Sequence, residues 1–467
     1  MTRAWRRLWL AASPIAFMVL SARAAQPQNI EAVDRFILEE MERAKIPGMA
    51  IGIVRKGEVL AAKGYGLANV EHQVPVSAET IFQSGSVGKQ FTAAAVMLLV
   101  QDGKLSLDDP ITKFFTDAPE PWKRITVRHL LTHTSGIPDY NAKSLDYRRD
   151  YTEDDLTRVA YDLKLEFPPG LRWNYSNTGY VLLGILVHEV SGQFYGDVLR
   201  ERVFTPLEMK TARVISEADI VPNRAAGYRL VADELKNQTW VAPQLNTTAD
   251  GSLYVSINDM VAWSKGVSQK AVLGKNGWAR VLEPARLNSG SRYPYGLGWQ
   301  IDTIAGQVRF HHGGSWQGFK TFLSRYERED LTIIVLANLA QADTERIEEG
   351  IAAILMPSLA RATPSRVTED PKVRARLESL LVAAQKGGLS PTDFAYVRSG
   401  FFPDMAAVYE QQLSKLGAPQ RITLLSRKKL GDDQVYTYEA YFGDFPTLVT
   451  LGLAPDGRAS QLGIRPK

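Results

Sequence analysis

The sequence predicts an α/β protein of the α+β type. We expect an antiparallel sheet flanked by helices, an inserted helical lobe, and a small C-terminal α+β domain. Runs of β-forming residues occur early, at 49–66, and again late, at 295–338. Helical periodicity and loops fill most of the chain between them. A further set of helix and strand patterns follows a polar, proline-bearing stretch at 362–371.

The N-terminal segment differs from the rest of the chain. Arginines at 3, 6 and 7 precede an apolar run at 8–20, and small residues follow at 21–25. This order is typical of a secretory signal peptide, which we predict over residues 1–24. The apolar run is too short to favour a transmembrane anchor. We therefore expect an exported protein, periplasmic or secreted, with no stable membrane anchor.

Composition excludes several classes of function. The 467 residues are 45% hydrophobic and 23% charged, as in an ordinary globular protein. The formal net charge is +4, but four arginines and no acids precede Ala25, so the remainder sums to 4 − 4 = 0. A neutral chain gives no reason to expect nucleic acid as a partner. With no cysteine, disulfides, thiolate metal sites and a cysteine nucleophile are excluded.

The first large domain is predicted over residues 25–360. A helical pattern at 30–44 ends at Pro47-Gly48, and a β hairpin follows at 49–66. Because open sheet edges are unfavourable, we expect this hairpin to join the late strands in one antiparallel sheet. Those strands are predicted at 295–301, 307–311, 320–326 and 331–338, before a last helix at 347–355. A cleft between sheet and helical lobe is the expected place for a site.

An accessory α+β domain of unknown role is predicted over residues 365–467. Its sequence shows two helical patterns and then four strand patterns, with Pro455-Asp456-Gly457 as the turn of the last hairpin. The helices are expected at 373–385 and 404–416, and the strands at 421–426, 434–442, 448–453 and 459–464.

Ser86 and Lys89 form the first candidate for chemistry. From Ser86 onward the apolar residues recur at helical spacing, so Ser86 is predicted to open a helix. Residues three apart on a helix are neighbours, so the Lys89 amine can reach the Ser86 hydroxyl. Free N–H groups at a helix start can stabilise a developing negative charge. This stretch could supply a nucleophile, its base and part of an oxyanion site.

Two similar patterns are set aside, the first as accidental and the second as structural. Ser426 and Lys429 share the spacing, but they lie in an alternating, strand-like and basic run. His129 and His133 have the i, i+4 spacing of a helical zinc pair, but no glutamate lies between them and Ser135-Gly136 breaks the helix. We therefore predict no metal site and no cofactor.

Two further polar stretches are candidates for the same cleft. Tyr175 and Asn177 lie on a turn before an apolar helix, where a phenol can move protons and an amide can bind substrate. The alternative for that stretch is a polar loop with a helix cap. His312, Gly314 and Ser315 lie where one strand is expected to end, and glycines there would let a substrate approach the backbone. An ordinary glycine-rich turn is the alternative.

The three stretches together resemble the serine β-lactamase and penicillin-binding protein family, most closely its class C and esterase-like branch. The ordered motifs are Ser86/Lys89, Tyr175/Asn177 and His312-Gly313-Gly314. Stretches at 130–136, 203–209 and 295–299 also look like this family, and the resemblance covers about residues 30–356.

The resemblance implies acyl transfer from a small-molecule or short-peptide substrate. Ser86 would attack a carbonyl, and Lys89 and Tyr175 would share proton transfer, with the main base left open. Asn177 would hold the amide side of the substrate. The backbone N–H groups of Ser86 and Ser315 would form the oxyanion hole.

His312 departs from the lysine that β-lactamases usually carry. Histidine is a weaker, pH-dependent cation, and here it resembles the esterases and peptidases of the family. We therefore predict a serine hydrolase acting on an ester, amide or D-amino-acid peptide bond. The alternatives are a true β-lactamase and a non-catalytic, penicillin-binding-like protein that holds peptides. The oligomeric state is left open.

Overall fold

The computed structural model describes residues 27–141, 143–216, 218–360 and 368–466. The predicted signal peptide lies outside the described residues. Across those four described segments, no helix is both long enough and apolar enough to cross a membrane.

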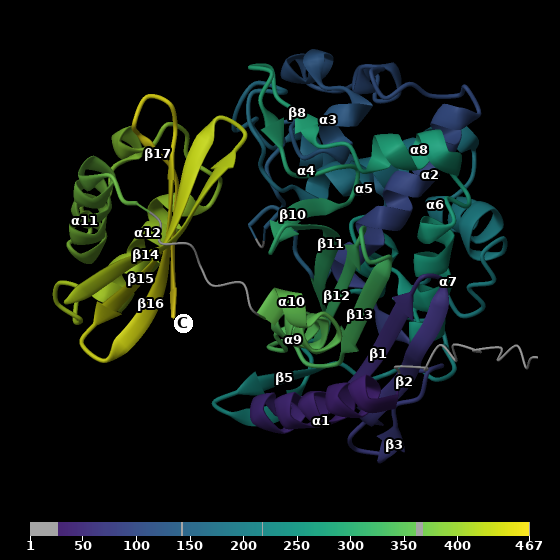
Figure 1. The fold of residues 1–467 in the computed structure, drawn as a ribbon. Coiled ribbons are helices and arrows are strands. Elements are labelled where there is room, and N and C mark those ends of the chain that lie inside the picture. The colour runs from purple at the N-terminus through teal and green to yellow at the C-terminus, as the bar shows by residue number, and fades with distance from the viewer. Residues whose placement is uncertain (1–26, 142, 217, 361–367, 467) are drawn as a thin grey trace, which may run out of the picture.

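The predicted fold class is confirmed by a seven-stranded antiparallel sheet that contains both the early hairpin and the late strands (Figure 1). Met49 pairs with Ala337, so the early hairpin adjoins the last of the late strands. The strand order is β10-β11-β12-β13-β1-β2-β3. The strands are β1 (Gly48–Arg55), β2 (Glu58–Asn69), β3 (Val74–Pro75), β10 (Gln300–Ile304), β11 (Gln307–Trp316), β12 (Phe319–Tyr326) and β13 (Leu331–Ala337).

Strand β1 is buried on both faces because helices cover the sheet on each side. Successive side chains of a strand point to opposite faces. Met49, Ile51 and Ile53 belong to the core formed with α1 (Pro27–Ala44) and α9 (Thr344–Leu355). Their neighbours on β1 belong to the larger core shared with the helical lobe. There helix α7 (Ile257–Ser268) packs against Gly52 so closely that a Cβ on Gly52 would lie 3.1 Å from Ile257.

The helical lobe contains two helices that are buried nearly all round, α2 and α5. A helix that is apolar on every side belongs in a protein core, and these two helices pack on each other in the largest core of the protein. The lobe's helices are α2 (Lys89–Gln101), α3 (Val127–Leu131), α4 (Glu153–Tyr161), α5 (Asn177–Ser191), α6 (Tyr195–Leu199), α7 (Ile257–Ser268) and α8 (Gly274–Val281). Short pairs β4 (Phe82–Gln83) with β7 (Tyr254–Val255) and β8 (Ala285–Arg286) with β9 (Arg292–Tyr293) complete it. The hairpin of β5 (Tyr228–Val231) and β6 (Glu234–Asn237) lies instead beside α1, where Tyr228 joins the core on the other face of the sheet (Figure 1).

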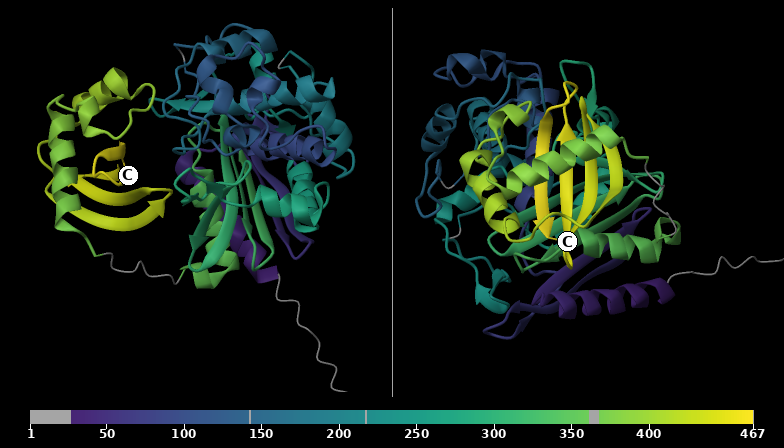
Figure 2. Two further views of the ribbon diagram at one scale, coloured as in Figure 1. Left: turned by 90° about the horizontal axis from the view of Figure 1, so that it is seen from above. Right: turned by 90° about the vertical axis from the view of Figure 1, so that its left-hand side faces the viewer.

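Residues 368–466, here called the C-terminal module, form a second sheet with its own core (Figure 2). Helices α11 (Pro371–Gln385) and α12 (Ala406–Leu413) pack against a four-stranded antiparallel sheet. The strands are β14 (Arg421–Leu430), β15 (Asp433–Phe442), β16 (Phe445–Leu453) and β17 (Ala459–Pro466). Helix α10 (Pro357–Ala360) is the last element before the module.

The C-terminal module is fixed to the helical lobe by polar and aromatic contacts. Arg172 pairs with Asp433 at 3.0 Å, and both side chains are less than a fifth exposed. The Arg172 guanidinium also lies over the ring of Tyr396, which meets Phe167 edge to face. Asp432 accepts hydrogen bonds from two serines of the β8–β9 hairpin. These contacts hold the module beside the lobe that carries Tyr175.

Candidate active site

Ser86 lies in a short 3-10 helix, not in the first turn of the α-helix. The 3-10 helix covers Gly85–Gly88, and α2 begins at Lys89. The predicted helix start is therefore displaced by three residues. Gly85 has a φ of +49°, and a Cβ there would lie 2.4 Å from the Ser315 nitrogen. A larger residue would not fit, so the tight turn brings Ser86 against strand β11.

The Lys89 amine faces three acceptors. Its Nζ lies 3.0 Å from the Ser86 hydroxyl oxygen and 2.6 Å from the Asn177 side-chain oxygen, and it also donates to the Asp250 carbonyl. The Lys89 side chain is fully buried. A neutral amine has two N–H groups and one lone pair. If Asn177 and Asp250 take the two N–H groups, the lone pair points at Ser86.

Asn177 is oriented by Asp139. The carboxylate of Asp139 accepts the backbone N–H of Asn177 at 2.8 Å and its side-chain N–H at 3.0 Å. The amide oxygen must therefore face Lys89. Asn177 is the first residue of α5, and the Ser176 side chain caps that helix by accepting the Gly179 N–H. This stretch therefore contains a helix cap, which was the alternative interpretation, and also the Asn177 contact with Lys89.

Burial shifts the ionisation of the two central charged groups in opposite directions. Burial lowers the pKa of Lys89 to about 8, although the charges of Asp250 and Asp139 raise it. Burial raises the pKa of Asp139 to about 6, against the hydrogen bonds from Asn177 and the charge of Lys89. Lys89 therefore supplies some neutral amine at neutral pH, as a general base requires.

Tyr175 lies beside Ser86 and remains a protonated phenol. Burial raises the pKa of Tyr175 well above its usual value, against the opposing effect of the neighbouring Ser86 hydroxyl. The Lys89 Nζ lies 4.9 Å from the centre of the Tyr175 ring. A phenol that keeps its proton can donate but is a poor base, so the ionisation of the pair favours Lys89 as the base.

His312 lies inside strand β11, not at a strand end as the sequence suggested, and the turn falls at residues 317–318. Its Nδ1 is 2.7 Å from the Gly313 carbonyl and its Nε2 is 3.1 Å from the Tyr295 hydroxyl. Tyr295 also lies 3.1 Å from His133 Nε2, and His133 Nδ1 accepts the Ser176 N–H. These contacts allow a single proton arrangement for two neutral histidines.

In that arrangement each ring nitrogen has one role. His133 donates from Nε2 to Tyr295, Tyr295 donates to His312 Nε2, and His312 donates from Nδ1 to the Gly313 carbonyl. Burial, reinforced by the Lys89 charge, lowers the pKa of His312 to about 3. The expectation of a pH-dependent cation at His312 is therefore wrong for the free protein, because the ring is buried and neutral.

The backbone on either side of Ser86 packs directly on β11. A Cβ on Gly314 would lie 2.2 Å from the Ser84 carbonyl and 3.0 Å from the Ser86 nitrogen. Thr321 on β12 also donates to the Ser84 carbonyl at 2.6 Å. Only glycine at 314 permits this approach, and it brings the Ser86 and Ser315 N–H groups into the same region. This is the geometry that an oxyanion site needs.

Ser86 opens into a cavity of about 190 Å³. Its lining brings together Ser86, Asn177 and Ser315 from three distant parts of the chain, and adds aromatic and acidic side chains that the sequence did not indicate. The full lining is Gly85, Ser86, Asp139, Tyr140, Tyr147, Asn177, Thr248, Asp250, Gly251, Ser252, Ser315 and Trp316. His312 and Gly314 lie behind this surface, buried, and support it from β11.

Four residues near the site received no site role from the sequence: Asp139 and Asp250 were not named, His133 was interpreted as structural, and Tyr295 appeared only in a family-like stretch. Asp139 follows the stretch at 130–136 by three residues, and Asp250 contributes a backbone carbonyl that no side-chain pattern can indicate. Asp250 also accepts the Tyr140 hydroxyl at 2.6 Å. Their importance depends on burial beside Lys89, which is set by long-range packing.

The first of the two patterns set aside lies away from Ser86, and the second is divided between a helix cap and the network behind Ser86. Ser426 and Lys429 both lie on β14 of the C-terminal module. His129 Nδ1 accepts the Thr126 N–H in a capping box of α3, while His133 belongs to the network with Tyr295. Within the described part of the chain, no three His, Asp or Glu side chains are grouped to hold a metal ion.

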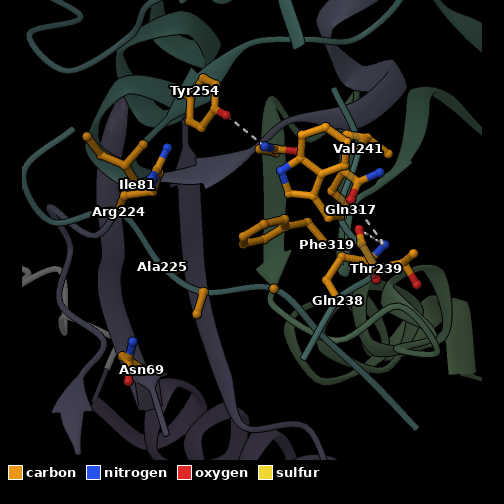
Figure 3. Close-up of a pocket in the computed structure, with 14 residues that line it drawn as sticks. Asn69, Ile81, Arg224, Ala225, Gln238, Thr239, Val241, Tyr254, Gln317 and Phe319 are labelled. Atoms are coloured by element: carbon orange, nitrogen blue, oxygen red, sulfur yellow. Dashed lines mark hydrogen bonds between the residues drawn. The ribbon is translucent and has the colours of Figure 1, made fainter. Parts of the chain in front are cut away.

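A second cavity, of about 360 Å³, shares no lining residue with the first (Figure 3). Gln83 donates to the Tyr254 hydroxyl at 2.8 Å, and Gln238 donates to Gln317 at 3.1 Å across it. The carboxamide-rich lining of this second cavity differs from the Ser86–Lys89 arrangement, so the candidate active site is the cavity at Ser86.

The antiparallel sheet, the helical lobe and the Ser86–Lys89 pair define a serine hydrolase. A model of the Beta-lactamase family matches residues 33–355. The chain belongs to this family, whose members include serine β-lactamases and penicillin-binding proteins.

Relatives and solved structures agree with this assignment. The chain is 29% identical to Penicillin-binding protein 4* of Bacillus subtilis over 62% of its length and 67% of the relative. It is 28% identical to the D-aminopeptidase of Gluconobacter oxydans over 70% of its length and 61% of the relative. The chain thus spans about two thirds or less of these curated relatives. An octameric penicillin-binding protein homologue from Pyrococcus abyssi superposes with a TM-score of 0.62 at 25% identity, covering 92% of this chain and 94% of that chain.

Proposed function

We propose that this protein is an exported hydrolase that forms an acyl-enzyme on Ser86 and acts on an ester, an amide or a peptide bond of a D-amino acid. The observation that carries the proposal is the 3.0 Å contact between Lys89 Nζ and the Ser86 hydroxyl, with the pKa of Lys89 lowered to about 8. The resemblance to a D-aminopeptidase supports the choice of substrate class.

Acylation begins with proton transfer from Ser86 to neutral Lys89. Asn177 and Asp250 accept the two amine N–H groups, so the lone pair is directed at the hydroxyl hydrogen. The Ser86 oxygen attacks the substrate carbonyl, and the N–H groups of Ser86 and Ser315 stabilise the oxyanion. Loss of one such donor typically costs about 3 kcal/mol of barrier.

The leaving group departs with a proton supplied directly by the protonated Lys89, or by Tyr175, which the protonated Lys89 then reprotonates. Tyr175 is suited to this step because its phenol stays protonated beside Ser86. Water then attacks the ester carbonyl, the acyl–oxygen bond breaks, and the proton returns to Ser86. Both half-reactions use the same pair of groups in opposite directions.

The test is intact mass after incubation with a fluorophosphonate and, separately, with a penicillin. Wild type is expected to gain one fluorophosphonate adduct, and Ser86→Ala is expected to gain none. Ser84→Ala, two residues away, is the matched control and should still be labelled. No adduct on wild type, or an equal adduct on Ser86→Ala, would contradict the assignment of Ser86 as the nucleophile.

Rates of hydrolysis of different substrates then identify the preferred substrate class. We expect p-nitrophenyl esters and D-alanyl peptides to be hydrolysed faster than a chromogenic cephalosporin, because His312 is neutral and both its nitrogens are occupied. A faster reaction with the cephalosporin would favour a β-lactamase. Labelling without turnover of any substrate would favour a peptide-binding protein.

Export is proposed from the N-terminal segment alone. The arginines, apolar run and small residues at 1–25 supply the argument. Edman sequencing of protein recovered from the periplasm or medium of an expressing bacterium is expected to begin near Ala25. Recovery of uncleaved protein from the cytoplasm would refute it.

A further inference from the structure

The active-site cavity adjoins a larger cavity of about 540 Å³ whose far wall belongs to the C-terminal module. The two cavities share Asp139 and Tyr140 in their linings. Tyr175 lines the larger one together with Arg398 and Asp404 of the module. A molecule bound at Ser86 and extending past Tyr175 would therefore meet the module.

Arg398 is an unpaired cation in this cavity. It is exposed, and its guanidinium makes no ion pair and no hydrogen bond with any residue that the structure describes. The other charged side chains of the lining all have partners. Lys143 pairs with Asp404 at 2.5 Å, and Asp139 accepts both N–H groups of Asn177.

Glu166 is the remaining acid of the lining, and it is also occupied. It accepts the Asn174 side-chain N–H and the backbone N–H of Ser399. Because Ser399 follows Arg398 directly, the second bond holds the loop that carries Arg398. The arginine is therefore positioned while its own donors are left for a ligand.

The cation that the sequence placed at His312 is absent, because that ring is neutral and buried. Arg398 supplies a permanent positive charge on the Tyr175 side of the nucleophile instead. Its planar guanidinium can bind a carboxylate through two parallel hydrogen bonds. The side of the cleft matters, because Tyr175 is one of the two proposed proton donors to the leaving group.

We propose that the Arg398 cavity is a subsite for a carboxylate on the leaving group of the substrate. The C-terminal module then sets specificity, by selecting substrates whose departing portion ends in a carboxylate. In a peptide this portion is a C-terminal amino acid. The inference rests on the proposed hydrolase function and adds the chemistry of the group that leaves.

The test uses two phenylacetate esters in the full-length protein. One ester has 3-hydroxybenzoate as its leaving group and the other has 3-hydroxybenzamide, so they differ only in the charge of the departing phenol. Arg398→Gln is expected to lower kcat/KM for the carboxylate ester by about tenfold or more, mainly through KM, because a charge-assisted pair is lost. Its kcat/KM for the carboxamide ester should stay within about twofold, since no charged hydrogen bond is involved.

Two further variants control this result. Arg398→Lys keeps the charge but lacks the planar guanidinium, so its kcat/KM for the carboxylate ester should lie between those of wild type and Arg398→Gln. Arg465→Gln removes an exposed arginine from β17, outside the cavity lining, and should leave both esters unchanged. Equal losses on both esters, or no loss on either, would overturn the subsite.

A matched peptide pair separates this inference from the proposed function. Peptides ending in D-alanyl-D-alanine are compared with the same peptides as C-terminal amides. If neither peptide is cleaved but the ester pair behaves as described, the peptide substrate is wrong and the carboxylate subsite stands. If wild type hydrolyses neither ester, both the proposed function and the subsite fail.

Discussion

Asp139 accepts two hydrogen bonds from Asn177, one from its backbone N–H and one from its side-chain N–H. This pair fixes which atom of the amide faces Lys89. Without it, rotation of the amide by half a turn would present an NH₂ group to the Lys89 amine and direct the lone pair away from Ser86. The orientation of Lys89 therefore depends on the Asp139 carboxylate, which acts through Asn177.

Asp139→Asn is the first prediction. It is expected to lower the plateau rate of acylation by about tenfold or more, because the base loses its fixed orientation. Removing the Asp139 charge also lowers the pKa of Lys89, since that charge raises it. The rising limb of kcat/KM against pH should move to lower pH in an ester assay.

Asp250→Asn separates charge from orientation. It removes a charge that also raises the pKa of Lys89, while Asp139 still holds Asn177. The limb should again move to lower pH, but the plateau should change by less than in Asp139→Asn. Equal plateaus in the two variants would refute the orienting role of Asp139.

The second prediction concerns the pH dependence of the wild type. Lys89 must be neutral to accept the Ser86 proton, and its pKa is about 8. The neutral fraction rises with pH, so kcat/KM should increase up to a midpoint near pH 8 and then level off. Tyr175 should add no inflection to the profile of kcat/KM in this pH range, because burial raises the pKa of Tyr175 well above the usual range.

Lys89→Met tests the same assignment. It is expected to lower the acylation rate by about 10²- to 10⁴-fold, the usual contribution of a general base, and to remove the limb near pH 8. Near-ultraviolet circular dichroism should match wild type, since methionine fills a similar buried volume. A variant that retains the limb would show that another group titrates.

The third prediction follows from the neutral histidines. Tyr295→Phe leaves His133 Nε2–H without an acceptor and His312 Nε2 without a donor, and both rings are buried. The free energy of unfolding should fall by about 2–3 kcal/mol, as expected for buried groups that lose their partners. Urea denaturation measures it.

Tyr161→Phe is the matched control for that variant. The Tyr161 hydroxyl makes no hydrogen bond to any residue of the described segments, so its loss should change stability by less than about 0.5 kcal/mol. If both tyrosine variants unfold at the same urea concentration, the proton arrangement through His133 and His312 would be wrong.

The extent of agreement between sequence and structure follows the range of the interactions. The strand at 331–338 and the helix at 30–44 were predicted closely, because alternation and helical spacing are local signals. The first strand of the C-terminal module continues to Leu430, four residues beyond its prediction, because pairing with β15 overrides its basic composition. Ser86 was assigned to the wrong type of turn, because Gly85 adopts a left-handed conformation imposed by β11.

The same difference between local signals and long-range packing explains which residues of the candidate site could be predicted. Spacing alone brought Ser86 and Lys89 together, and ordered motifs added Tyr175 and Asn177. The ionisation state of His312 could not be predicted, because it depends on burial and on the Lys89 charge, which long-range packing brings together. Arg398 could not be predicted either, since its place beside Tyr175 results from the docking of two separately packed cores.

The last prediction concerns that docking. Arg172 and Asp433 form a 3.0 Å ion pair between the lobe and the module, and each is less than a fifth exposed. Arg172→Gln and Asp433→Asn should each weaken the docking, and a double-mutant cycle on unfolding should give a coupling of about 1 kcal/mol, as for a partly exposed pair.

The Ser399 amide, which is hydrogen-bonded to Glu166 across the same interface, should exchange its hydrogen faster in both variants. Amides of β1, buried inside the main sheet, should exchange as in wild type. Loosening the module should also reduce the preference for the carboxylate ester without affecting fluorophosphonate labelling of Ser86, because Arg398 is held by the module and Lys89 is not. Unchanged exchange at Ser399 in both variants would show that the Arg172–Asp433 pair is not needed to fix the module.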